Sequence, residues 1–223
     1  MKAVFRSLFV SALLLAVVSG TQAQDLHRTF DASSGGKLVL DLETGGTITI
    51  RGWDRSEVEV SVSVDGRDAD EVIVEFDQTS RAIEVFSEYE SRSSNADVDM
   101  EINVPSEFNL EISTTGGDID VSGITGRIEG SSMGGDLTLD GLRGEVDMST
   151  MGGDIELTDS EVDGTLHTMG GDVTISNVTG NINGTTMGGD VTYNNVRSNR
   201  SGANDEESIS TMGGDVDVDG ALY

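Results

Sequence analysis

A tripeptide, Gly-Gly-Asp, recurs through the second half of the chain at a nearly constant interval. It begins at six positions, separated by 18, 18, 18, 18 and 25 residues: Gly116, Gly134, Gly152, Gly170, Gly188 and Gly213. Glycine also recurs every nine residues from Gly117 to Gly189, with one lapse at Val162. Because a fixed period of this length is the signature of stacked repeats, the sequence predicts coils of 18 residues, each made of two nonapeptide half-turns.

Apolar residues follow each glycine pair with the spacing of a strand. Counting the second glycine as the first place, they stand at the third, fifth and eighth places, as in Ile119, Val121 and Ile124. A spacing of two puts side chains on one strand face, whereas helical spacing is absent and frequent glycine disfavours helix. The apolar period of six that marks a hexapeptide left-handed β-helix is also absent. We therefore predict an all-β chain with a parallel β-solenoid (β-helix or β-roll), with antiparallel hairpins as the alternative.

Two departures from the regular period are expected to alter the stack locally. Between Leu157 and Met169 the apolar pattern shifts by two residues, as if one turn were longer and the next shorter. The last interval grows to 25 residues through residues 198–207, a run rich in Ser, Asn and Gly. Such composition is typical of loops, so we expect a mobile loop that projects from the stack.

The region before the repeats carries longer alternating segments. Residues 46–53 already have the glycine and apolar spacing of the later half-units, and alternation continues over residues 58–64, 72–76, 83–86 and 98–104. These segments are typical of half-buried strands. Because the open end of a solenoid must be capped, we predict an antiparallel β cap over residues 24–112 and the Gly-Gly-Asp solenoid over residues 113–223.

The first 23 residues have the pattern of a secretory signal peptide. Lys2 and Arg6 precede an apolar run over residues 8–18, and Thr21 and Ala23 stand before the expected cleavage point. This run is shorter than the roughly 20 apolar residues that span a membrane. We therefore expect a periplasmic, outer-surface or secreted protein with no integral membrane segment after cleavage.

Composition narrows the classes of partner and of site. The chain has no cysteine, which removes disulfides and thiolate metal sites, and its formal net charge is −28. A field of this sign repels nucleic acid and anionic lipid. The acidic residues cover the whole chain, as in a general surface adaptation to salt.

Stacking would align equivalent residues about 4.8 Å apart from coil to coil. One such ladder is the candidate binding site: Asp118, Asp136, Asp154, Asp172, Asp190 and Asp215. In the structural interpretation each carboxylate bonds nearby turn amides. In the functional alternative the same ladder holds calcium between coils, although calcium takes six to eight oxygens and each coil offers one fixed Asp. No other cofactor is expected.

Methionines form a second ladder: Met133, Met151, Met169, Met187 and Met212. We expect these side chains to be packed core, since Met fills irregular gaps; five identical, evenly spread residues are unlike a thioether copper site. Pairs of Ser and Thr, such as Ser149-Thr150, precede them and are expected to bond along the stack or to present a flat hydroxyl face. Such a face would suit ice or glycan.

The sequence gives little support to catalysis. His27 lies near the start of the exported chain and His167 replaces a Ser or Thr ladder position, so neither has evident triad partners. A polysaccharide-active β-helix enzyme, the remote alternative, would use two carboxylates in a cleft, whereas no pair stands out here. We therefore expect no enzymatic activity.

The order of three motifs resembles a known family. Gly52-Trp53-Asp54, then a strand ending in Val104-Pro105, then serial Gly-Gly-Asp units resemble the bacterial "putative adhesin" β-strand-repeat family of unknown function. The resemblance implies an exported β-solenoid with no assigned catalytic residues. We expect a noncatalytic, adhesin-like structural or binding module that presents a repetitive face to a cell-surface or envelope polymer or protein. A calcium-stabilised β-roll is the alternative.

Overall fold

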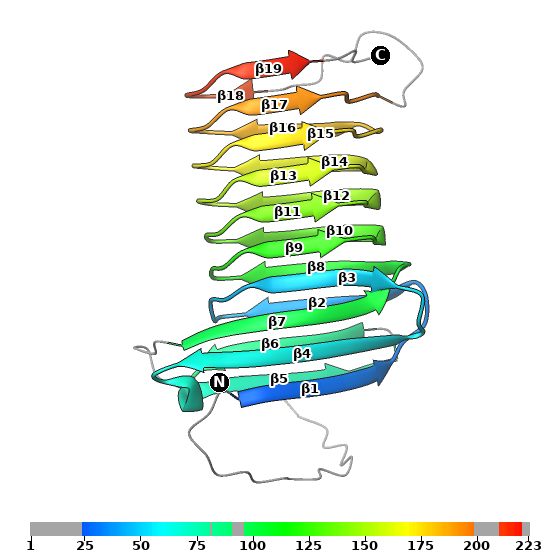
Figure 1. The fold of residues 1–223 in the computed structure, drawn as a ribbon, viewed down its shortest axis with the longest axis vertical. Helices are drawn as coiled ribbons and strands as arrows, with labels where there is room; N and C mark the ends of the chain where they lie inside the picture. Colours follow the sequence, from blue (N-terminus) through cyan, green and yellow to red (C-terminus); the bar gives the residue numbers. More distant parts are fainter. Residues whose placement is uncertain (1–23, 81, 91–95, 199–209, 220–223) are drawn as a thin grey trace, which may run out of the picture.

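The computed structural model describes residues 24–80, 82–90, 96–198 and 210–219, which form two β-sheets that face each other along a tall stack (Figure 1). The sheets contain ten and nine strands, so the predicted all-β class is confirmed, and both sheets are mixed. The only helical segment among the described residues is a 3-10 turn, η1 (Ala69–Glu71). None of the described helical residues forms a segment of the length and apolarity needed to cross a membrane.

The first sheet, sheet A, begins with three long strands and continues through seven shorter ones. In spatial order these strands are β1 (Gln24–Asp31), β4 (Glu57–Gly66), β7 (Ala96–Pro105), β3 (Ile48–Trp53), β9 (Ile119–Ser122), β11 (Leu137–Asp140), β13 (Ile155–Thr158), β15 (Val173–Ser176), β17 (Val191–Asn194) and β19 (Val216–Asp219). Pairing is antiparallel between β1, β4 and β7 and parallel from β7 to β19.

The second sheet, sheet B, runs in the same direction along the stack. From the first end its strands are β5 (Val72–Gln78), β6 (Ala82–Tyr89), β2 (Gly36–Leu42), β8 (Phe108–Thr114), β10 (Thr125–Ser132), β12 (Arg143–Thr150), β14 (Glu161–Thr168), β16 (Ile182–Thr186) and β18 (Ser210–Thr211). Only the β5–β6 pair is antiparallel. Each coil of the repeats thus contributes one strand to each sheet.

Strands of the repeats pair in parallel with partners 18 residues away, as Leu137 does with Ile119 and Ile128 with Val146. Antiparallel hairpins are therefore wrong for this region. The register is also constant where the apolar pattern shifts, because Gly144 lies opposite Val162 and Val146 opposite Gly164. No turn lengthens there: the buried hydroxyl of Ser160 takes the place of Leu142 and accepts a hydrogen bond from the Leu142 amide at 2.9 Å.

The segments before the repeats join the same stack. β2 pairs in parallel with β8, and β3 with β9, so that Ile48 lies opposite Ile119. β4 to β7, which follow β3 in the chain, lie toward the first end, where β1 and β5 form the edges (Figure 1). Both sheets continue through residue 112, and the division into a cap of residues 24–112 and a solenoid of residues 113–223 stays a prediction.

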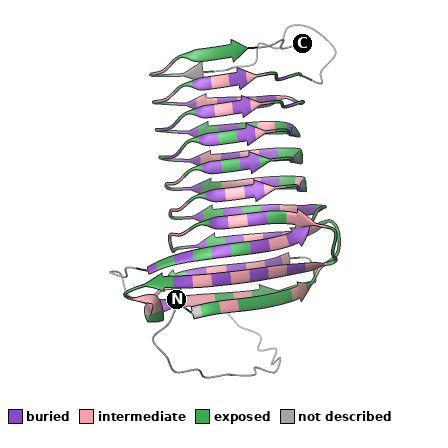
Figure 2. Ribbon diagram, viewed as in Figure 1, coloured by how far each residue is buried: buried purple, intermediate pink, exposed green. Residues whose placement is uncertain are grey.

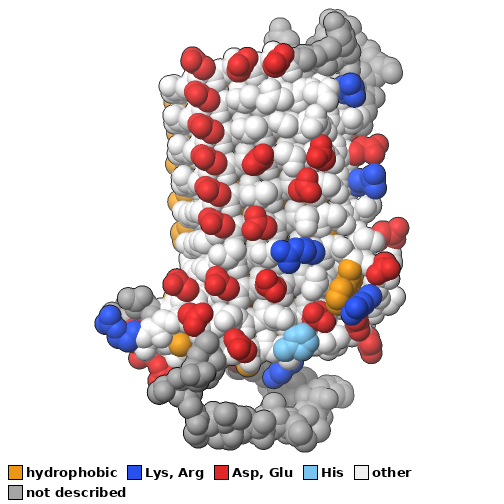
Figure 3. Space-filling model, viewed as in Figure 1, with side chains coloured by type: hydrophobic (Ala, Val, Ile, Leu, Met, Phe, Trp, Pro, Cys, Tyr) orange, Lys and Arg blue, Asp and Glu red, His pale blue; other side chains and the backbone are white. Residues whose placement is uncertain are grey.

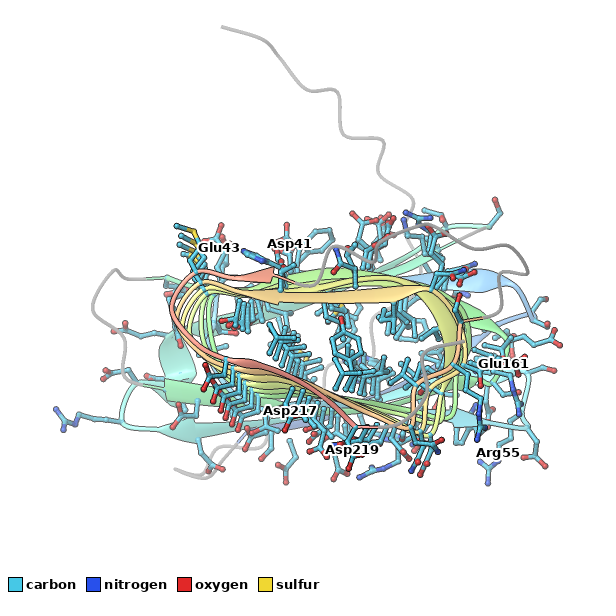
Figure 4. All side chains as sticks on the ribbon, turned by 90° about the horizontal axis from the view of Figure 1, so that it is seen from above. Asp41, Glu43, Arg55, Glu161, Asp217 and Asp219 are labelled. Carbon is cyan, nitrogen blue, oxygen red and sulfur yellow. The ribbon has the colours of Figure 1, made fainter. Side chains whose placement is uncertain are left out.

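The core fills the space between the sheets, where inward and outward side chains alternate along each strand (Figure 2). Apolar residues at the predicted third, fifth and eighth places are buried from Ile119 to Val196, whereas Val216 and Val218, on the last described strand of sheet A, are exposed. Seen down the stack, inward side chains of the two sheets meet across the interior (Figure 4). One hydrophobic cluster runs from Leu38 to Val196, which gives every coil the shared burial that a single coil lacks.

The second glycine of each Gly-Gly-Asp lets successive coils approach closely. A Cβ atom at Gly153 would lie 2.7 Å from the Asp136 nitrogen and closer still to the Gly135 carbonyl, whereas one at Gly152 would meet nothing nearer than 3.9 Å. Real Cβ atoms essentially never approach within 3.0 Å of such neighbours. In this unit the stacking itself therefore requires the second glycine and leaves room at the first.

In one coil a large core residue on sheet A faces a glycine on sheet B, where the coil below has two aliphatic residues. Tyr193 on β17 occupies the place of Ile175 in the coil below, and its side chain is buried. Across the interior, Gly184 on β16 stands where the coil below has Leu166. The Tyr193 hydroxyl fills the space that Gly184 leaves and accepts a hydrogen bond from the Gly184 amide at 2.6 Å.

Two predicted segments lie outside the described residues. They are the signal peptide over residues 1–23 and, beyond residue 198, the projecting loop of residues 198–207.

Candidate functional site

The six aspartates of the predicted ladder form a column at the edge of sheet A, each just before a strand. Their acidic side chains run up the left side of the stack in Figure 3, and all six are exposed. The amide of each aspartate donates a hydrogen bond to Oδ1 of the aspartate one coil earlier, over 2.7 to 2.9 Å, from Asp136 onto Asp118 up to Asp215 onto Asp190. The ladder carboxylates therefore bond backbone amides, as the structural interpretation expects. A binding role for the ladder stays a prediction.

These bonds explain why Asp recurs after each glycine pair. A carboxylate that accepts a backbone amide makes a charge-assisted hydrogen bond, and here that bond ties one coil to the next. The same arrangement continues below the ladder, where the Thr47 amide donates to Asp99 Oδ1 at 2.7 Å. Within the described part of the chain, no three His, Cys, Asp or Glu side chains gather closely enough to hold a metal ion.

The outer face of sheet A adds two more polar columns. One contains Thr138, Glu156 and Thr174, and the other contains Asp140, Thr158 and Ser176, with the Thr158 hydroxyl donating to Asp140 Oδ1 at 2.9 Å. The strands β9, β11, β13, β15, β17 and β19 contain no Lys, Arg or His. This face of the repeats, which we call the A face, therefore presents carboxylates and hydroxyls without a basic side chain.

The outer face of sheet B differs because it carries ion pairs. Arg127 contacts Glu129, Glu145 and Asp147. The hydrogen bonds that the Arg127 guanidinium donates to Glu129 and Glu145 raise its pKa above its ordinary value. Lys37 and Arg143 of the same sheet likewise contact Glu111 and Glu161, so cations on sheet B are paired with acidic neighbours, while the A face keeps its negative charge.

The two members of each Ser/Thr pair have different roles. The second member is buried, and its hydroxyl bonds a glycine carbonyl of the coil below: Thr150 to Gly135 at 3.1 Å, Thr168 to Gly153 at 2.8 Å and Thr186 to Gly171 at 2.7 Å. The first member points outward from sheet B. The inner hydroxyls therefore bond along the stack, whereas the outer residues Ser149 and Thr185 are half-buried on the outside of sheet B.

The expectation that the methionine ladder is packed core is wrong. The exposed fractions of Met133, Met151, Met169 and Met187 are 56%, 49%, 45% and 42%, and that of Met212 is 81%. Strand alternation explains the difference, because the preceding Ser or Thr turns inward to bond the glycine turn and the next side chain must turn outward. Apolarity alone suggested burial, whereas the hydrogen-bonding needs of the turn decide the orientation.

The two histidines lie in different sheets. His27 is on β1, where Nδ1 lies 3.0 Å from the Ser61 hydroxyl, and His167 is on β14, where Nδ1 lies 2.8 Å from the Thr185 hydroxyl. Both side chains are exposed. The structure therefore does not bring them together.

Two hollows lie near the first end of the stack. One, of about 470 Å³, has Asp31 as its single acidic lining residue, beside Lys37, Gln78 and Phe108. The other, of about 280 Å³ on sheet B, is lined by Ile73, Phe86 and four acidic residues, Asp41, Glu43, Glu75 and Glu88. Asp41 and Glu43 project outward from the stack (Figure 4). Sequence reasoning missed this acidic hollow because its residues come from three separate strands.

Residues 24–221 match a protein family described as Toastrack DUF4097. A solved structure described as a "putative adhesin" from Bacteroides fragilis has a TM-score of 0.53 at 14% identity, covering 87% of this chain and 97% of that chain. A "putative cell adhesion protein" from Clostridium sporogenes has a TM-score of 0.45 at 12% identity, covering 90% and 96%. A search of curated protein sequences gives no match.

Proposed function

Since this chain belongs to the Toastrack DUF4097 family, we propose that it is a noncatalytic β-solenoid binding module whose A face contacts a cell-surface or envelope polymer or a protein partner. The observation that carries the proposal is the repetition of one polar pattern on this face from coil to coil. A partner that repeats along its own length can contact several coils at once, and linked weak contacts add up to high avidity.

The chemistry of the A face favours a cationic, hydroxyl-rich partner. Its strands from β9 to β19 carry carboxylates and hydroxyls and no basic side chain. In the aspartate column Oδ1 already accepts an amide, as Asp136 does from Asp154, so the second carboxylate oxygen is the atom that a partner would contact. An amino-sugar polymer offers both ammonium and hydroxyl groups to such a surface.

We place the protein at the cell envelope or outside the cell. The signal-like pattern of residues 1–23 supports export, and the adhesin description of the similar Bacteroides fragilis structure agrees with a surface role. The charge of −28 disfavours nucleic acid and anionic lipid as partners. The adhesin-like role rests on this reasoning together with the repeated A face.

The proposal is tested by binding of the purified protein to a panel of immobilised polysaccharides that are neutral, anionic or rich in free amino groups. We expect retention on the amino-group polymer and weaker retention at high salt. The triple variant Asp136→Asn, Asp154→Asn and Asp172→Asn removes three charges while each Asn Oδ1 still accepts the amide of the next coil. It should bind more weakly than the unmodified protein.

The matched control removes as many charges from sheet B, with Asp41→Asn, Glu75→Gln and Glu88→Gln. These three residues are exposed, and the control should bind as the unmodified protein does. Equal loss in both triple variants would assign binding to net charge alone. Unchanged binding of the A-face variant, or no binding to any of the polymers, would overturn the proposal.

A further inference from the structure

The exposed methionines lie one above another along one edge of the stack. Hydrophobic side chains line the left margin of Figure 3, and sulfur atoms superpose in one row in the view down the stack in Figure 4. Backbone bonds of 3.2 Å from the Met133 amide to Thr114 and from the Met151 amide to Ser132 keep these positions in register. Neighbouring methionines are therefore one strand spacing apart, about 4.8 Å at the backbone.

The turn does not require methionine at this position. The Thr115 amide bonds the Leu42 carbonyl at 3.1 Å, in the same way as the Met133 amide bonds Thr114. Thr115 therefore occupies the methionine position one coil earlier, and Glu43 occupies it in the coil before that. Strand alternation explains why these five side chains are exposed, but because polar residues occupy the same position in two coils, the fold does not explain why five methionines follow in succession.

The chemistry that distinguishes methionine from other exposed apolar residues is its thioether. Thioether sulfur is a ligand for soft ions such as Cu(I). A metal–sulfur bond of about 2.3 Å, the length known for zinc and thiolate, lets two sulfurs about 4.6 Å apart share one ion. One coil of spacing provides nearly this separation, and the three rotatable bonds of methionine supply the remaining adjustment.

One coil adds a nitrogen ligand to the column. His167 and Met169 are separated by the buried Thr168, so both side chains lie on the outer surface of the same coil. The His167 Nδ1 lies 2.8 Å from the Thr185 hydroxyl. When Nδ1 donates to that hydroxyl, Nε2 carries the lone pair, which is the arrangement that orients histidine for metal ligation.

We propose that Met151, His167, Met169 and Met187 form a binding site for a soft monovalent metal ion, Cu(I) or its redox-inert substitute Ag(I). His167 is the one histidine beside the methionine column in the described repeats, so we place the centre of the site at its coil. Met133 and Met212 lie farther along the same column and are outside it. The site is independent of the A face, because it lies on the edge between the sheets.

The test is titration of the purified protein, carrying 13C-methyl-labelled methionine, with silver nitrate in chloride-free buffer. The methyl resonances of Met151, Met169 and Met187 should shift at substoichiometric silver, while those of the buried Met100 and Met148 stay unchanged. The triple variant Met151→Leu, Met169→Leu and Met187→Leu should lose at least about tenfold in affinity, and His167→Gln about as much. Anaerobic Cu(I) competition with a chromogenic chelator should give the same ranking.

Leucine keeps the column apolar and removes only sulfur, so the triple variant separates metal binding from an apolar docking role. The matched control, Met133→Leu with Met212→Leu, changes two exposed methionines of the same column and should retain silver affinity. Thermal unfolding of every variant verifies that the fold is intact. Silver that shifts no exposed methyl group, or that binds the triple variant as tightly as the unmodified protein, would overturn the site; equal loss in the control would overturn its assignment to His167.

Discussion

Substitution of Gly153 by alanine tests whether the second glycine of Gly-Gly-Asp exists to let coils approach. The new Cβ would lie 1.9 Å from the Gly135 carbonyl oxygen, its nearest neighbour, so the coils must move apart by about 1.5 Å to reach ordinary contact at 3.4 Å. Two hydrogen bonds cross this junction, from the Leu137 amide to the Asp154 carbonyl and from the Asp154 amide to Asp136 Oδ1, each 2.8 Å long. The same movement would lengthen both to about 4.3 Å, beyond the reach of a hydrogen bond.

The cost follows from these two effects. Forcing extra volume into a packed junction costs about 1–3 kcal/mol, and each lost hydrogen bond about 0.5–1.5 kcal/mol. We expect Gly153→Ala to lower the free energy of unfolding by about 2–6 kcal/mol. For a chain of this size each kcal/mol corresponds to a fall of about 2–4 °C in melting temperature.

Urea and thermal unfolding followed by far-UV circular dichroism measure this difference. The matched control is Gly152→Ala in the same tripeptide, whose Cβ meets nothing nearer than 3.9 Å. We expect the control to stay within about 1 kcal/mol of the unmodified protein. Gly153→Ala at the stability of the control, or an equal loss in both, would refute the argument that close approach of coils selects this glycine.

Three further predictions concern the contacts between coils. Thr168→Val should lower the free energy of unfolding by about 1–3 kcal/mol in urea, because it removes a buried hydroxyl that donates to Gly153 at 2.8 Å; the exposed Thr165→Val is the control, and equal effects would contradict this role. Raising NaCl from 0.1 to 1 M shortens the screening length from about 10 to about 3 Å, below the spacing of the aspartate column, so the melting temperature should rise, and a fall would contradict it. Saturating calcium and EDTA should give the same melting temperature, since the five ladder carboxylates from Asp118 to Asp190 already accept an amide; a clear rise with calcium would restore the calcium-stabilised β-roll.

The stacking of the repeats could be predicted because it depends on residues that recur. Ile119 and Val121 lie at strand spacing after the glycine pair, and both are buried as expected. That β3 belongs to the stack could also be predicted, because Ile48 and Ile50 repeat that spacing. In the structure they lie opposite Ile119 and Val121. The pairing of β3 with β9 could not be predicted from the local pattern, because the chain forms the strands β4 to β8 between them.

The orientation of side chains at the turns was harder to predict. Hydrophobicity favours Met151 over Thr150 for the interior, yet Thr150 is buried because its hydroxyl bonds the Gly135 carbonyl. Likewise the shift of apolar residues near Val162 indicated a shift in the backbone, whereas Ser160 keeps the register by satisfying the Leu142 amide. In both cases a polar group inside the stack has a bonding role that apolar patterns do not record.

The exchange between Tyr193 and Gly184 limits how this architecture can be cut and rejoined. The two residues belong to one half-revolution of the chain, from β16 to β17, and the tyrosine hydroxyl bonds the glycine amide at 2.6 Å. A transplanted segment that contains both β16 and β17 would carry both residues into a chimeric protein. A cut between β16 and β17 would separate the two residues and leave the Tyr193 ring facing a side chain that already fills the space. Variants with added or removed coils should therefore keep β16 and β17 together.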